Sequence, residues 1–245
     1  MYYDYKEGKK KVEEILNNNT EIQKKDIPKD DSNFTYDNGV RSWIGSIFVD
    51  IVDSKKLIGG ENDIVVSKVL RSFTSEIISI MNNSVNARQI GVRGDCVYGV
   101  FSTPSQEEIY ELVIISSYIN TLVKMLNKLF SKNGYPNIKV GIGVGVGEDL
   151  IVKAGKKGTG INDRIWIGKA VIDACVLADK AGRNGNDSIG YNSLAYNNFI
   201  GELVKTNPNA KNWFTSNYDY SIGNTVYYAE ITNVDFDNWI NDNLW

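Results

Sequence analysis

The segment at positions 47–54, which reads IFVDIVDS, decides the fold. Apolar and β-branched residues lie on both sides of Asp50, a pattern typical of a buried strand. A carboxylate at the end of such a strand must be paired, hydrogen-bonded or bound to a metal ion, because removing an isolated charge from water is very costly. The sequence therefore predicts a partner for Asp50.

The segment at positions 93–101, RGDCVYGVF, fits that requirement. It predicts a tight turn with Asp95 at its tip, followed by a second apolar strand. The chain between Asp50 and Asp95 has room for one helix and one strand. The two aspartates can therefore lie on neighbouring strands of one sheet.

Composition places the chain among ordinary globular proteins. It has 245 residues, of which 42% are hydrophobic and 23% charged, and its net charge is −3. No basic run indicates nucleic-acid binding, and no apolar stretch approaches the length of a membrane span. The polar N-terminus is unlike a secretory signal. We expect a cytoplasmic protein with no nucleic-acid partner and no direct membrane association.

The chain contains no histidine. This excludes Ser-His-Asp catalysis, histidine-based zinc sites and imidazole general bases. A bound metal ion would need oxygen ligands, and carboxylates favour Mg²⁺, Mn²⁺ or Ca²⁺. Cys96 and Cys175 lie in apolar contexts and are expected to be buried free thiols.

Apolar periodicity predicts the order β-α-β-β-α-β for the main domain, which we place at residues 41–245 after an arm or linker at 1–40. This is the ferredoxin-like core of an α+β protein, with helices on one face of an antiparallel sheet. The first strand then lies beside the hairpin, so that Asp50 and Asp95 converge at one edge. The expected core elements are strands at 43–52, 88–93, 96–101 and 137–146, and helices at 62–82 and from 105 to about 129.

Glycines alternate with β-branched residues in the strand at 137–146. This pattern indicates a close backbone approach or a bulge or, equally, a strand that lies flat under a helix. Beyond it we expect a short strand at 149–154, a loop at 155–160, a short strand at 164–167 and a helix at 168–181. Residues 183–245 predict one further strand, at 225–231.

Two carboxylates at a sheet edge can hold two divalent cations, which can activate a hydroxyl and neutralise a triphosphate. The turn at Asp53 and Ser54 can offer backbone N–H groups to phosphate oxygens, and Lys156 and Lys157 can reach the same phosphates. Phosphoryl transfer depends mainly on positioning and charge neutralisation, so it needs no histidine. The alternative is that the first aspartate is capped by backbone donors and the second only forms a turn.

Four segments in order resemble the motifs of the class III nucleotide cyclases. The resemblance covers about residues 43–182. It implies that Asp50 and Asp95, with the Ile51 carbonyl, hold two Mg²⁺ or Mn²⁺ ions, and it implies a head-to-tail homodimer with shared active sites. The four segments are FVDIVDS at 48–54, VRGDCVY at 92–98, KVGIGVG at 139–145 and DRIWIGKAV at 163–171.

The chain departs from adenylate and guanylate cyclases at the positions that bind the purine. Those positions fall on Gly91 and Ile165, which offer no side-chain hydrogen bonds. The family's transition-state asparagine falls near Ile172 or Asp173, and its arginine near Val176 or Leu177. Arg183, Arg164 or a lysine at 156–157 would have to replace that arginine.

With Arg164 and Trp166 at the purine-reading segment, the chain is similar to the bacterial Pycsar pyrimidine cyclases, which make cyclic UMP or cyclic CMP as antiphage signals. The resemblance implies that UTP or CTP is converted to its 3′,5′-cyclic monophosphate and pyrophosphate. Arg164 would donate hydrogen bonds to a pyrimidine carbonyl, and Trp166 would fill the space beside the smaller ring, unless it is a core aromatic.

Two other functions remain open on the sequence. One is an adenylate cyclase with an atypical pocket, and the other is a catalytically inactive cyclase fold that binds a nucleotide. A diguanylate cyclase shares the βαββαβ core, but its acidic, glycine-rich hairpin signature is absent around Asp95.

Overall fold

The computed structural model describes residues 2–30, 34–156 and 162–244, and the chain divides into two compact units. The larger unit comprises Trp43–Asp149 and Ile167–Trp245, and the smaller comprises Met1–Ser42 and Leu150–Trp166. Two long strands, β2 (Asn38–Ile51) and β5 (Val140–Gly155), contribute residues to both. The sequence did not indicate that residues 150–166 group with the N-terminal segment.

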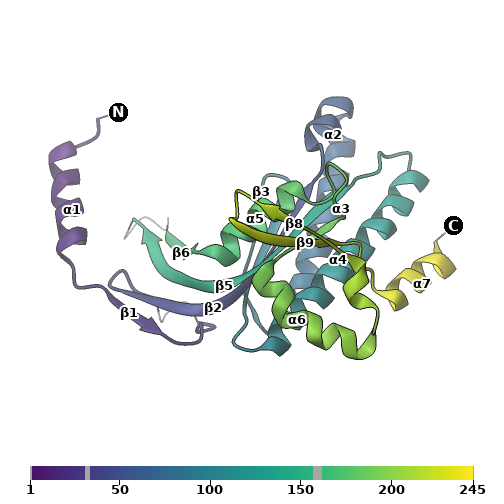
Figure 1. Ribbon diagram of the computed structural model, residues 1–245. Helices are drawn as coiled ribbons and strands as arrows, with labels where there is room; N and C mark the ends of the chain where they lie inside the picture. The colour runs from purple at the N-terminus through teal and green to yellow at the C-terminus, as the bar shows by residue number, and fades with distance from the viewer. Residues whose placement is uncertain (1, 31–33, 157–161, 245) are drawn as a thin grey trace. The chain divides into compact units, whose positions relative to one another are not determined.

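A mostly antiparallel sheet forms the centre of the larger unit (Figure 1). Its strand order is β3-β4-β2-β5-β7-β9-β8, with β5 and β7 parallel. The first four strands in this order have the predicted ferredoxin-like arrangement, so the α+β class is confirmed. The remaining strands are β3 (Ala87–Arg93), β4 (Cys96–Ser102), β7 (Ile189–Asn192), β8 (Phe214–Asp219) and β9 (Asn224–Ala229).

Helices α3 (Asp63–Asn82) and α4 (Gln106–Lys132) pack against one face of this sheet. Ser105 and Glu108 form a capping box that starts α4. The helix is long and apolar enough to cross a membrane, but 61% of its most apolar window is buried inside the larger unit. Burial on this scale is typical of a core helix. The same unit contains α2 (Ser54–Gly60), α6 (Ser193–Thr206), a 3₁₀ turn (Ala210–Trp213) and α7 (Val234–Asn243).

Helix α5 (Lys169–Lys180) packs on the opposite face, against the glycines of β5. A Cβ atom on Gly143 would lie 1.9 Å from the Ala174 carbonyl oxygen, and one on Gly145 would lie 2.2 Å from that of Ala170. The valines and isoleucines between the glycines point into the core on the other face. The glycines therefore mark a close backbone approach beneath a helix, so both interpretations of the pattern apply.

Asp149, a residue of β5, caps the N-terminal end of α5. Its fully buried carboxylate accepts hydrogen bonds from the N–H groups of Ala170 (3.2 Å) and Val171 (3.4 Å). A Cβ atom on Gly168 would lie 2.1 Å from a carboxylate oxygen of Asp149. The missing side chain at Gly168 therefore makes room for a cap supplied by a distant residue.

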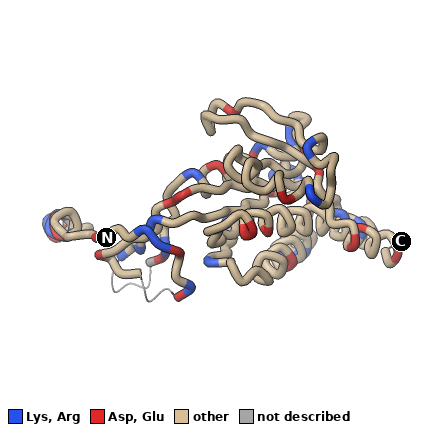
Figure 2. Tube along the Cα trace, turned by 60° about the horizontal axis from the view of Figure 1, so that its bottom comes forward, with Lys and Arg blue, Asp and Glu red and all other residues tan. Residues whose placement is uncertain are grey.

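The smaller unit contains α1 (Tyr5–Asn17), which Asp4 caps and which buries no side chain. Strand β1 (Glu21–Lys24) pairs in parallel with the first residues of β2, and β6 (Asn162–Ile167) pairs with β5. Acidic and basic residues are interspersed along the trace of both units (Figure 2).

Several elements differ from the sequence-based prediction. The segments expected as two strands at 137–146 and 149–154 form one continuous β5. Besides the expected strand, residues 183–244 contain β7, α6, the 3₁₀ turn, β8 and α7. Strand β7 is only four residues long and fully buried, so its sequence has no alternation to detect.

The contact between β5 and α5 yields a stability prediction. Gly143→Ala should lower the free energy of unfolding by about 1–3 kcal/mol or more, because the added methyl group meets backbone that cannot turn aside. Gly201→Ala is the matched control, since Gly201 lies in α6 with open space around it. The free energy of unfolding of that variant should rise by about 0.5–1 kcal/mol. Urea denaturation measures the free energy of unfolding of both variants. Equal changes in the two variants would contradict the close packing of α5 on β5.

The Asp149 cap yields a prediction on pH. Burial raises the pKa of Asp149, although the N–H groups of Ala170 and Val171 oppose the rise. The native state then binds this proton more tightly than the unfolded state, so its contribution to stability grows as the pH falls through the raised pKa. Relative to Asp149→Asn, the native chain should gain stability between neutral pH and about pH 4. Parallel urea titrations test this, and a relative loss would refute it.

Candidate active site

The register of β2 against β4 brings Asp50 to Asp95. Val49 pairs with Val97 in the antiparallel ladder, so Asp50 follows the last pair and lies beside the turn that holds Asp95. Gly94 makes that turn possible with φ at 64°. The convergence predicted from the two motifs is therefore present in the structure.

Like charges surround Asp50. Burial raises the pKa of Asp50 above its ordinary value, and repulsion from Asp95 and Asp179 raises it further. Asp179 lies at the C-terminal end of α5 and was not among the predicted site residues. An edge where two further carboxylates repel Asp50 favours the binding of cations.

Arg183 supplies the positive charge at this edge. Its Nη2 donates to Asp50 Oδ2 at 2.7 Å and to the Ile51 carbonyl at 3.3 Å. The hydrogen bond and the charge of Arg183 act to lower the pKa of Asp50, against the effect of burial. The predicted candidates Asp50, Asp95, Ile51 and Arg183 thus lie together within one chain.

Two thiols lie close to the same carboxylates. Burial raises the pKa of Cys96 to about 12, with a further contribution from Asp50. Cys175, on α5, is exposed rather than buried as expected. Both thiols are free.

The donor set fits a hard divalent cation. In the parts of the chain that the structure describes, no three acidic, cysteine or histidine side chains are grouped so as to hold a metal ion by themselves. Mg²⁺ commonly takes one or two protein carboxylates and completes its shell with water and substrate phosphates. The carboxylates of Asp50 and Asp95 and the Ile51 carbonyl meet that description.

The predicted phosphate-binding residues fall in different parts of the chain. Asp53 has left-handed backbone (φ 56°) directly before Ser54 opens α2, which is a backbone pattern of anion-binding nests. The Asp53 side chain pairs with Lys56 at 2.5 Å. Lys156 follows the end of β5 in the smaller unit, and Lys157 lies outside the described residues.

The predicted base position at Gly91 lies under an aromatic ring. A Cβ atom on Gly91 would lie 2.6 Å from the ring and the hydroxyl oxygen of Tyr98, its partner on β4. Tyr98 stacks on Phe48, with ring centroids 5.3 Å apart, and Gln89 Nε2 donates to the Tyr98 hydroxyl at 3.5 Å. The sequence did not indicate this aromatic pair, and the glycine opposite Tyr98 was the available signal.

The other base candidates belong to the smaller unit. The Arg164 guanidinium lies 5.8 Å from the Phe34 ring centroid and 5.4 Å from that of Trp166. Ile165, between them, is 44% exposed. Arg164 and Trp166 contact each other within this unit, and their assignment to the base stays a prediction.

The positions of the family's transition-state residues have other roles in this chain. Asp173 is buried and accepts a hydrogen bond from Asn192 Nδ2 at 2.9 Å, and Leu177 is fully buried in the core. Ile172 is 57% exposed and apolar. None of these side chains can act as the missing arginine, which keeps Arg183 as the candidate within the larger unit.

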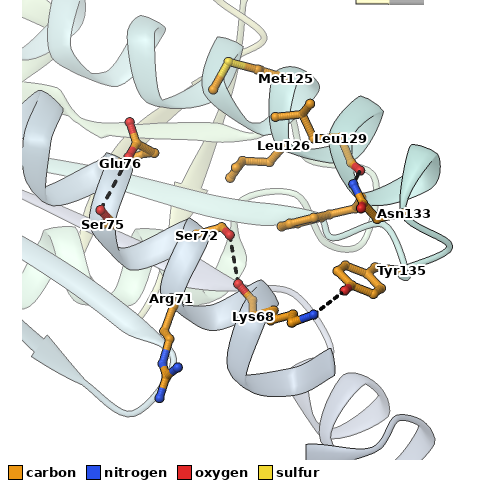
Figure 3. Close-up of a pocket in the computed structure, with 11 residues that line it drawn as sticks. Lys68, Arg71, Ser72, Ser75, Glu76, Met125, Leu126, Leu129, Asn133 and Tyr135 are labelled. Carbon is orange, nitrogen blue, oxygen red and sulfur yellow. Dashed lines mark hydrogen bonds between the residues drawn. The ribbon is translucent and has the colours of Figure 1, made fainter. Parts of the chain in front are cut away.

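A separate cavity of about 740 Å³ lies between α3 and α4 (Figure 3). None of the predicted site residues lines it. Met125, Leu126 and Leu129 form its apolar side, and Lys68 donates to the Tyr135 hydroxyl at 2.9 Å. In Figure 3 Arg71 points away from that apolar side.

Comparison with known proteins agrees with the geometry. A protein from Treponema porcinum named uridylate cyclase is 42% identical over 244 residues, covering 100% of this chain and 83% of the relative. Another of that name, from Gulbenkiania mobilis, is 27% identical over 253 residues, covering 98% and 97%. The crystal structure of the adenylyl cyclase CyaB from P. aeruginosa matches with a TM-score of 0.62 at 16% identity, covering 80% of this chain and 98% of that one. No family model matches the chain.

The chain therefore belongs to the class III nucleotide cyclases, a class of phosphorus-oxygen lyases that act on nucleoside triphosphates and generally use divalent metal ions. Within that class it is similar to the Pycsar uridylate cyclases.

Proposed function

We propose that this nucleotide cyclase converts UTP, or alternatively CTP, into the 3′,5′-cyclic monophosphate and pyrophosphate, as a second messenger in antiphage defence. The observation that carries the proposal is the convergence of Asp50 and Asp95 in a chain 42% identical to a protein named uridylate cyclase. The 3′-hydroxyl oxygen of the substrate attacks the α-phosphorus, and pyrophosphate leaves.

In this proposal Asp50, Asp95 and the Ile51 carbonyl hold two Mg²⁺ or Mn²⁺ ions, which supply charge neutralisation and lower the pKa of the attacking hydroxyl. The backbone at Asp53 and Ser54 donates to phosphate oxygens. Arg183, Lys156 and Lys157 replace the family's arginine or add positive charge at the triphosphate.

The proposal also covers assembly and organisation. Residues 41–245 act as the catalytic domain and 1–40 as an arm, and two chains form a head-to-tail homodimer with shared sites. Because Val176 and Leu177, near which the family's arginine falls, are both apolar, each site needs a cation from elsewhere. The enzyme acts in the cytoplasm without direct membrane association and binds no nucleic acid.

The first test is a competition among ATP, GTP, CTP and UTP with the purified protein and Mn²⁺. Cyclic UMP or cyclic CMP should dominate, and Asp50→Asn and Asp95→Asn should each lower kcat by about 100-fold or more, because the metal ligands supply several kcal/mol. Asp37→Asn, in the smaller unit, is the charge-matched control and should keep its activity. Dominant cyclic AMP would favour an adenylate cyclase, and nucleotide binding without product would favour an inactive module.

The second test concerns base selectivity. Gly91 and Ile165 offer no polar side chain to a purine, whereas Arg164 can donate hydrogen bonds to a pyrimidine carbonyl. Arg164→Ala should reduce the preference between UTP and CTP by roughly 1–3 kcal/mol in kcat/KM. Trp166→Ala should let purine triphosphates compete. If both variants lose all four substrates equally, these residues do not select the base.

A further inference from the structure

Arg183 lies where the proposed function requires a cation. Its Nη2 contacts both Asp50 Oδ2 and the Ile51 carbonyl oxygen, at 2.7 Å and 3.3 Å. These are two of the oxygens assigned to the divalent cations. A divalent cation held by these oxygens would bring a second positive charge close to the guanidinium, and the two like charges repel each other.

The other arm of the guanidinium is anchored on α5. Nη1 donates to the carbonyl oxygens of Ala178 (2.9 Å) and Ala181 (3.4 Å). These carbonyls lie at the C-terminal end of the helix, where the helix dipole favours positive charge. One arm therefore has fixed backbone partners, and the other arm contacts the carboxylate edge.

Glycine backbone makes this position of Arg183 possible. A Cβ atom on Gly141 would lie 2.9 Å from Nη1, and Gly182 takes φ 68° in the turn before Arg183. The side chains of Arg183 and Asp50 are only 20% and 25% exposed, so water screens their attraction less than it does at the surface. The surrounding backbone of the larger unit thus holds the contact between Arg183 and Asp50 in place.

We propose that Arg183 is the resident cation of the metal-free site, and that its bond to Asp50 competes with the binding of a divalent cation. Arg183 holds Asp50 and the Ile51 carbonyl in place and offsets the repulsion from Asp95 and Asp179. As a metal ion binds there, the repulsion between the two cations drives Nη2 away from Asp50. The freed Nη2 is then a donor for the anionic substrate. This inference rests on the proposed two-metal site, but not on which nucleotide is cyclised.

The test is Mn²⁺ binding to the nucleotide-free protein, measured by electron paramagnetic resonance of the free ion and by calorimetry. Arg183→Gln removes the competing cation and should tighten Mn²⁺ binding about tenfold, which corresponds to ~1.4 kcal/mol. Arg71→Gln makes the same change on α3, away from the carboxylates, and should leave the affinity within about twofold of the native value. Unchanged or weaker binding in Arg183→Gln, or no binding in any variant, would overturn the proposal.

A second measurement uses the native chain, so it does not depend on how the variant folds. The guanidinium ¹⁵N signals of Arg183 should shift and exchange faster on addition of Mg²⁺, while those of Arg71 stay unchanged. If the Arg183 signals stay unchanged while the Asp50 carboxyl signal responds to Mg²⁺, both cations bind together, and the proposed competition is refuted. Neither readout uses product formation, so a protein that makes no cyclic nucleotide can still pass both tests.

Discussion

The close contact between α5 and β5 is the constraint on which the site depends. Because Gly141, Gly143 and Gly145 carry no side chain, the carbonyl groups of α5 lie directly against the strand. Asp149 holds the N-terminal end of the same helix. The helix is thereby fixed at both ends, and the turn that follows it brings Arg183 to Asp50. The acidic edge and its counter-charge come from segments far apart in the sequence.

The sequence predicted the features that local patterns determine. The strand around Asp50, the hairpin at Gly94 and Asp95 and the two long helices follow from apolar periodicity and turn chemistry, and the structure has all of them. The convergence of the two aspartates followed from strand order alone. Arg183 was proposed because the expected arginine was absent, but no local pattern indicated that it contacts Asp50.

The remaining features depend on tertiary contacts. Asp179 acts on Asp50 because α5 packs on β5, the neighbour of β2 in the sheet. The aromatic pair Phe48 and Tyr98 forms only in the register of β2 with β4. Cys175 has apolar sequence neighbours, yet it lies on the exposed side of α5. Burial at such positions is set by neighbouring elements rather than by neighbours in the chain.

The contact of α5 through its backbone also has a consequence for sequence divergence. A helix that docks by its main chain does not rely on its outward side chains for its position, so those side chains can change without moving the helix. In this chain the apolar Ile172 and the thiol of Cys175 occupy such exposed positions. Substitutions there can alter the chemistry presented by α5 while Gly143 and Ala174 keep the frame constant. The helix can thus acquire new specificities in an unchanged scaffold.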